Sequence, residues 1–136
     1  MKAETLWRGV FAALFIMVTY LTLTPNPDDT KPSIAIACFI AELLFHDERF
    51  GDKVAHFMAY AALGGAAAFA GLAIAGRRAY LIGALALYGA LLEFVQGLGG
   101  VRAPEFADAL ANSLGALAAF PAALAVERLA LRLRPQ

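Results

Sequence analysis

The sequence predicts an all-α integral membrane protein, a bundle of four transmembrane helices that forms a single domain over residues 1–136. Of the 136 residues, 61% are hydrophobic and 16% are charged, against about 45 to 50% apolar and about 25% charged in soluble domains. Four segments almost free of charge have the length needed to cross a bilayer core about 30 Å thick. A helical form is expected because the chain lacks the alternating ten-residue segments of a membrane β-barrel.

The four predicted spans cover about residues 6–24, 53–76, 79–98 and 104–126. The first ends where Pro25 and Pro27 remove two backbone hydrogen-bond donors. A secretory signal peptide has a similar appearance, but residues 24–26 offer no small-x-small cleavage site. We therefore interpret the first segment as a retained span.

Residues 33–45, between the first two spans, are apolar but too few to cross a bilayer, and they include Glu42. We expect a short helix in the outer membrane interface. Its apolar side would consist of Ile36, Ile40, Leu43 and Leu44. The alternative is a cap over the bundle.

Basic residues predict the orientation of the spans, because they are retained on the cytoplasmic side. With the N-terminus inside, the eleven Lys and Arg residues divide into seven inner and four outer. The inner ones are Lys2, Arg8, Arg77, Arg78, Arg128, Arg132 and Arg134, and the outer ones are Lys31, Arg49, Lys53 and Arg102. The predicted topology is therefore N-in/C-in, and most acidic residues lie on the outer side.

Charge and cysteine content exclude several classes of protein. Eleven basic and eleven acidic residues give zero formal net charge, which argues against a nucleic-acid-binding protein. The single Cys38 excludes an intramolecular disulfide, and the Cys and His pairs of a structural zinc site are missing. We expect no cofactor.

Polar side chains gather near the outer ends of the last three predicted spans. They are Asp52, Lys53, His56 and Tyr60 at the start of the second span, Glu93 and Gln96 in the third, Arg102 in the following loop, and Asp108 and Asn112 in the fourth. A charged side chain in hydrocarbon costs about 2.5 to 3.5 kcal/mol on insertion scales, so such groups normally face a partner or a wet cavity. Their common depth favours one functional cavity.

Each group also has a structural interpretation. Glu93 and Arg102 would form a buried ion pair that fixes helix packing, and Asp108 would be a carboxylate at a helix N-terminus. His56 alone would be a capped interfacial histidine. Small residues indicate close helix packing. These are Ala107, Ala111, Gly115 and Ala119 on the fourth span and Gly64, Ala68 and Gly71 on the second.

We expect His56, Glu93 and Asp108 to be the catalytic residues if the site is an active site. His56 would act as general base or acid, since its ordinary pKa of about 6.5 is near the working pH. Glu93 and Asp108 would orient it or hold a cation. Substrate binding would fall to Asp52, Lys53, Tyr60, Gln96, Arg102 and Asn112. Arg102 would pair with phosphate or carboxylate, and an ion-paired cluster is preferred to a metal site because no dedicated metal motif is present.

A series of short motifs runs from the second span to the fourth. They are Asp52-Lys53-Val54-Ala55-His56, then Tyr60, Glu93-Phe94-Val95-Gln96, Arg102 followed by Asp108, and Asn112-Ser113-Leu114-Gly115. This ordered set resembles the VanZ-like family of small integral membrane proteins, and the likeness covers about half of the chain. The Thr24-Pro25 end of the first span is also similar. The chain departs from the family at Val101, where a Gly often precedes the Arg, and in having Ala where a second Gly often follows the last motif.

The resemblance implies a multi-pass protein of the bacterial cytoplasmic membrane with a cell-envelope role, linked to resistance to the glycopeptide teicoplanin. It does not supply a reaction. Three functions follow as hypotheses. The first is a site, enzymatic or binding, for an envelope lipid or glycan-linked head group at the outer leaflet. The others are a small proton-coupled transporter that uses Glu93 and a structural membrane scaffold.

Overall fold

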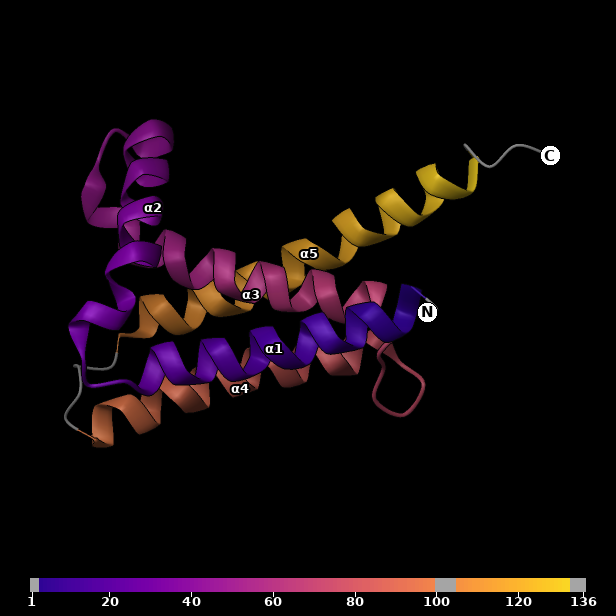
Figure 1. Ribbon diagram of the computed structural model, residues 1–136, viewed down its shortest axis with the longest axis horizontal. Helices are drawn as coiled ribbons and strands as arrows, with labels where there is room; N and C mark the ends of the chain where they lie inside the picture. The colour runs from indigo at the N-terminus through magenta and orange to yellow at the C-terminus, as the bar shows by residue number, and fades with distance from the viewer. Residues whose placement is uncertain (1–2, 100–104, 133–136) are drawn as a thin grey trace.

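A computed structural model describes residues 3–99 and 105–132, and these residues form helices joined by turns (Figure 1). The elements are α1 (Ala3–Leu23), α2 (Pro27–Phe45), the short 3-10 helix η1 (Glu48–Phe50), α3 (Gly51–Phe69), α4 (Arg78–Leu98) and α5 (Phe106–Arg132). The predicted all-α class is confirmed for this part of the chain. By length and composition, α1, α4 and α5 are able to cross a membrane.

Four long helices run side by side, and α2 projects across one end of them (Figure 1). We call this end, where α3 and α5 begin and α4 finishes, the α2 end of the bundle. The start of α1 and the finish of α5 lie at the opposite end, together with the turn between α3 and α4. The first helix therefore begins, and the last helix finishes, at the same end of the bundle.

Helix α3 occupies the centre of the bundle and packs against α5, α2 and α1. Its side chains Tyr60 and Leu63 are almost fully buried, and they join a core with Val18 of α1, Leu85 of α4 and Ala116 of α5. Because neighbouring helices cover α3, it needs fewer apolar side chains facing outward than its partners do. This explains why α3 carries Asp52, Lys53 and His56 in its first two turns.

The second predicted span is longer than the helix that the structure shows. The segment was expected to reach residue 76, but α3 ends at Phe69 and the chain turns before α4. Gly71 and Gly76 have φ of +66° and +71°, a conformation that ends a helix and that glycine adopts without a Cβ clash. An isolated bridge between Ile74 and Arg77 closes the turn. Because Gly71 lies in this turn, beyond the end of α3, it is not part of the packing stripe expected on this helix.

Helix α2 begins six residues earlier than expected, at Pro27 rather than Ser33. The Asn26 side chain caps it by accepting a hydrogen bond from the Asp28 backbone amide at 3.2 Å, and proline suits the first helical position. Asp29 then ties α2 to α1, because its carboxylate accepts a hydrogen bond from the Tyr20 hydroxyl at 2.6 Å. The location of α2 in a membrane interface stays a prediction.

Most of the apolar side chains of α2 face away from the bundle. Exposed side chains on this helix include Ile36, Leu43 and Leu44, whereas Ile40 is half-buried. Phe39, which the sequence reading did not single out, is 71% exposed. Among the side chains of α2 whose burial the structure describes, the buried ones are small, namely Ala37 and Ala41.

Candidate functional site

The expected polar residues come together at the α2 end of the bundle. Helix α3 contributes Asp52, Lys53, His56 and Tyr60, helix α4 contributes Glu93 and Gln96, and helix α5 contributes Asp108 and Asn112. Five of these side chains are buried, namely Tyr60, Glu93, Gln96, Asp108 and Asn112. Arg102 and its expected pairing with Glu93 lie outside the described residues.

His56 is the centre of this cluster, and its Nδ1 atom faces α4 and α5. Nδ1 lies 3.0 Å from Oδ1 of Asn112 and 3.5 Å from Oε1 of Glu93. The side-chain oxygen of Asn112 is an acceptor, so an Nδ1–H group donates this hydrogen bond, and the Glu93 carboxylate lies close to the same nitrogen. A neutral imidazole carries a single N–H, and Nε2 is then an acceptor with a lone pair. Asn112 therefore holds the ring of His56 in place, and the substrate-binding role expected for it from the sequence stays a prediction.

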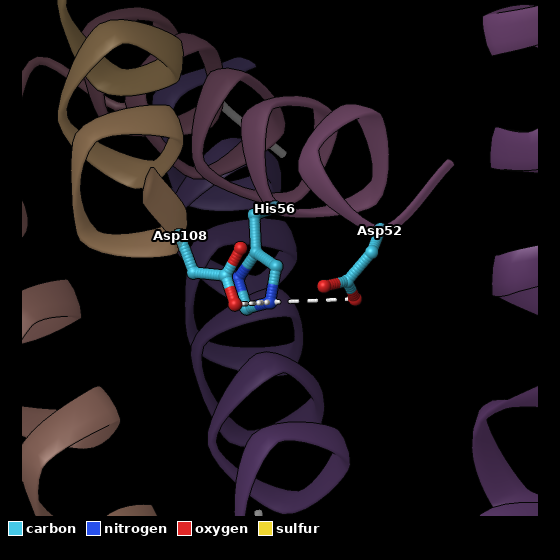
Figure 2. A group of neighbouring side chains, drawn as sticks. All are labelled: Asp52, His56 and Asp108. Carbon is cyan, nitrogen blue, oxygen red and sulfur yellow. Dashed lines mark ion pairs between the residues drawn. The ribbon is translucent and has the colours of Figure 1, made fainter. Parts of the chain in front are cut away.

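The Nε2 atom of His56 faces two carboxylates from different helices. Oδ1 of Asp52, one helical turn earlier, and Oδ2 of Asp108 each lie 3.8 Å from Nε2 (Figure 2). These separations exceed the usual range of a direct hydrogen bond. In Figure 2 the imidazole lies between the two carboxylates.

Lys53 connects the same two carboxylates on their other side. Its Nζ atom lies 2.5 Å from Oδ1 of Asp108 and 3.3 Å from Oδ2 of Asp52. It also donates to Oε2 of Glu105 at 2.5 Å. Asp108 is 1% exposed, and a buried carboxylate is tolerated when a cation pairs with it. The Lys53 ammonium is thus engaged by carboxylates of the protein, and its expected role in substrate binding stays a prediction.

Glu105 was not among the site residues expected from the sequence. It directly precedes α5, and its pairing with Lys53 joins the start of α3 to the start of α5. The sequence indicates this role of Glu105 only weakly, because an acidic residue before a helix usually interacts only with the helix N-terminus.

A cavity of about 630 Å³ opens beside the cluster, between α1, α2 and α3. Its apolar wall includes Met17 and Leu21 of α1 and Ile34 of α2. Asp52 and His56 line it together with Tyr60 and Gln96, and further polar positions are Thr22, Thr24, Asn26, Thr30 and Ser33. The sequence-based prediction of the site does not include α1 and α2, although Asn26-Pro27-Asp28-Asp29 is a recognisable helix start that places α2 next to the first helix.

Tyr60 is a buried group with an unused hydrogen-bonding capacity. Its side chain is 1% exposed, and the hydroxyl makes no hydrogen bond to any of the described residues. Leaving such a donor unsatisfied costs about 1 to 3 kcal/mol. Tyr60 also lines the adjoining cavity described above, and its expected substrate-binding role stays a prediction.

The cluster has the chemistry of a cation site. Asp52, His56 and Asp108 each offer one ligand atom, and these atoms lie within 4.8 Å of one another. Carboxylate oxygens and a neutral imidazole nitrogen are common metal ligands. The Lys53 ammonium already pairs with both carboxylates, and its positive charge opposes binding of a second, divalent charge at the same place.

Comparison of the chain with protein-family models, with curated proteins and with solved structures finds no match.

Proposed function

We propose that this chain is a multi-pass protein of the bacterial cytoplasmic membrane that binds a cell-envelope lipid, or a glycan-linked lipid, at the α2 end of its bundle. The observation that carries the proposal is the cavity between α1, α2 and α3. Its volume of about 630 Å³ falls within the range of about 300 to 1,000 Å³ typical of small-molecule sites. An apolar wall that meets Asp52 and His56 fits a molecule with a hydrocarbon part and a polar head group.

In this proposal α3 is the fourth transmembrane helix, and both termini are cytoplasmic. Helix α3 has 19 residues, which at about 1.5 Å per residue gives a length of about 28 Å, close to the thickness of a bilayer core. The α2 end then faces outward. Helix α2 crosses that end (Figure 1) with its apolar side exposed, as an interfacial helix would.

The proposed site also has the parts for proton transfer. Asn112 and Glu93 hold the Nδ1–H side of His56, so Nε2 is directed to the side of Asp52, which lines the cavity. Such an imidazole is able to take a proton from a bound hydroxyl or water, and Asp52 and Asp108 would stabilise the imidazolium that results. The resemblance to the VanZ-like family supports an envelope head group as the substrate and a link to teicoplanin resistance.

Filling the cavity tests the proposal directly. Ala55 lines the cavity next to His56, so Ala55→Leu places extra volume where the ligand would lie. Ala62 is exposed on the same helix, and Ala62→Leu is the matched control. Native mass spectrometry of protein incubated with a bacterial polar lipid extract should show bound lipid for the parent and for Ala62→Leu, with a clear loss for Ala55→Leu. Equal lipid binding by all three would refute the proposed cavity.

Substitutions in the cluster separate function from structure. His56→Ala and Glu93→Gln should insert and fold but lose the teicoplanin resistance or other envelope phenotype that the parent confers. If both retain that phenotype at normal expression, the cluster contributes packing alone. If both fail to accumulate in the membrane, the scaffold hypothesis is favoured.

The orientation is tested by labelling cysteines in intact cells. In a Cys38→Ala background, Ser33→Cys at the exposed surface of α2 should react with a membrane-impermeant maleimide. Ala73→Cys, exposed in the turn at the other end, should react only after permeabilisation. The reverse pattern would show that the bundle has the opposite orientation.

A further inference from the structure

The wall of the cavity between α1, α2 and α3 includes a buried side-chain amide, that of Gln96. Gln96 lies in the last turn of α4, is 9% exposed and lines the cavity. Its amide makes no hydrogen bond to any of the described residues. A buried polar group without a hydrogen bond is unfavourable, so the amide of Gln96 needs a partner that this part of the protein does not supply.

Several other polar side chains of the wall are already held by the protein. The Thr24 hydroxyl and the Asn26 amide each donate to the carboxylate of Asp29 at 3.1 Å. Thr22, in the last turn of α1, differs from them. Like Gln96 it lines the cavity and makes no hydrogen bond within the described part of the chain, so both side chains remain available to a ligand.

The two side chains require a ligand group that both donates and accepts hydrogen bonds. A carboxamide has N–H donors and a carbonyl acceptor, and a hydroxyl is a donor and an acceptor at once. An ammonium only donates, and the anionic oxygens of a phosphate diester only accept. The neighbouring hydroxyl groups of a sugar do both, so they match Gln96 and Thr22 better than either charged group does.

The wall also lacks a cation that would neutralise a phosphate. Among the described residues that line the cavity there is no Lys or Arg. The nearby Lys53 ammonium pairs with Asp52, Glu105 and Asp108. A protonated His56 would pair with the two carboxylates that lie 3.8 Å from its Nε2 atom. Because burying an unpaired charge is costly, the cavity favours an uncharged head group.

We propose that the head group recognised here is an uncharged sugar, whose hydroxyl groups hydrogen-bond to Gln96 and Thr22 while the hydrocarbon part of the lipid lies against Met17, Leu21 and Ile34. The proposal rests on the lipid-binding function proposed above and specifies its substrate class. Gln96 then determines specificity and does not hold the bundle together.

Four lipids with identical acyl chains test the head-group class. Monoglucosyl diacylglycerol carries an uncharged sugar, and diacylglycerol lacks it. Phosphatidylglycerol combines hydroxyl groups with a phosphate charge, and phosphatidylethanolamine carries a phosphate and an ammonium. In native mass spectrometry of the purified protein, the glucosyl lipid should bind about tenfold more tightly than each of the other three, the change expected for two hydrogen bonds between neutral groups. Binding no tighter than that of any one of them would overturn the proposal.

Gln96→Met locates the selectivity, because it removes the amide and nearly keeps the length of the side chain. It should lower the affinity for the glucosyl lipid and leave the affinity for diacylglycerol unchanged. Thermal unfolding in detergent should occur at no lower temperature than in the parent, since the variant removes a buried polar group without a partner among the described residues. A preference for the glucosyl lipid that survives this change, or a clear loss of thermal stability, would overturn the role proposed for Gln96.

Thr22→Val tests the second contact, because valine has nearly the same shape without the hydroxyl. It should reduce the preference for the glucosyl lipid about threefold, as loss of one hydrogen bond does. Thr5→Val is the matched control, since Thr5 is exposed near the other end of α1 and does not line the cavity. Equal preferences in the two variants would overturn the contact with Thr22.

The remaining outcomes separate this proposal from the one it rests on. If the four lipids bind equally and Ala55→Leu still prevents binding, the sugar proposal is overturned and lipid binding in the cavity stands. If a phospholipid binds most tightly and Ala55→Leu prevents it, the cavity takes a charged head group, and again only the sugar proposal fails. If Ala55→Leu has no effect on any lipid, both proposals fail.

Discussion

The interface between α3 and α5 has two halves of opposite chemistry. At the α2 end, His56 of α3 meets Asn112 and Asp108 of α5 through polar atoms. Farther along, the same two helices meet through Gly64, Ala116 and Ala119, which have almost no side chain. The comparison shows that the small residues set the distance between the helices, and that this distance allows short polar side chains to reach His56.

Gly115 lies at the border between the two halves. A Cβ atom at this position would overlap the carbonyl oxygen of Phe57 and lie 3.0 Å from the backbone nitrogen of Ala61. The sequence-based prediction that Gly115 packs against another helix is confirmed. Because the obstructing atoms belong to the backbone, α3 and α5 would have to move apart to accommodate a larger residue.

The largest effect is therefore expected for Gly115→Ala. Overpacking of this kind costs about 1 to 3 kcal/mol, and separation of the helices would also weaken the contact between His56 and Asn112. Gly65→Ala is the matched control, because a Cβ there meets nothing within 4 Å and alanine favours a helix by about 0.5 to 1 kcal/mol over glycine. Thermal unfolding in detergent should show a loss for the first variant and none for the second. Equal stability would mean that the glycine does not set the helix separation.

A graded effect is expected at Gly64, in the alanine-lined half. A Cβ there would lie 3.0 Å from the carbonyl oxygen of Ala116 and 3.1 Å from Cβ of Ala119, which is tight but less so than at Gly115. Gly64→Ala should lower the free energy of unfolding by about 1 kcal/mol, at the mild end of overpacking. Lipid binding should change less than with Gly115→Ala, since Gly64 is farther from His56 along α3. A larger loss of binding at Gly64 would show that the two halves do not differ as proposed.

The polar half is tested through Asn112. Asn112→Ala removes the oxygen that accepts from Nδ1 of His56, and a hydrogen bond of this type contributes about 0.5 to 1.5 kcal/mol. Ser113→Ala is the control, because the Ser113 hydroxyl donates only to the Ala109 carbonyl of its own helix. The first variant should reduce both stability and lipid binding, and the second neither. Unchanged binding in Asn112→Ala would show that this amide does not orient His56.

The sequence predicted the polar half better than the cavity beside it. Spacings of four residues place Asp52 and His56, or Asp108 and Asn112, on one face of a helix whatever the rest of the fold does. The depth argument then brought α3, α4 and α5 together correctly, because charged groups avoid lipid. Such local rules cannot show which carboxylate oxygen faces Lys53 and which faces His56.

The cavity wall formed by α2 and the turn between α3 and α4 depend on tertiary features that the pattern of apolar residues does not contain. The wall formed by α2 follows from the angle at which the chain leaves α1, which Asp29 fixes through its hydrogen bond to Tyr20. The second span was drawn too long because residues 70–76 are apolar, although Gly71 and Gly76 adopt positive φ there. Hydropathy alone treats an apolar turn as a continuation of the helix.

The smallest effect is expected at η1, where charge is paired on the surface rather than within the bundle. The Arg49 guanidinium donates to both carboxylate oxygens of Asp47. This hydrogen bonding lowers the pKa of Asp47 below its ordinary value of 3.8, and the Arg49 backbone amide adds to the effect. Since the folded pKa is depressed, the contribution of Asp47 to stability is present above the ordinary pKa and is lost as the pH falls through the lowered one.

Arg49→Gln should therefore raise the pKa of Asp47 toward its ordinary value, which an NMR titration of the Asp47 carboxyl measures. Stability at neutral pH should hardly change, because exposed ion pairs contribute little. Lipid binding should be unaffected, since neither residue lines the cavity. If Arg49→Gln instead weakened lipid binding as much as Asn112→Ala does, then charge outside the bundle would contribute to the site as strongly as the buried cluster, and the contrast between surface and buried pairing would be wrong.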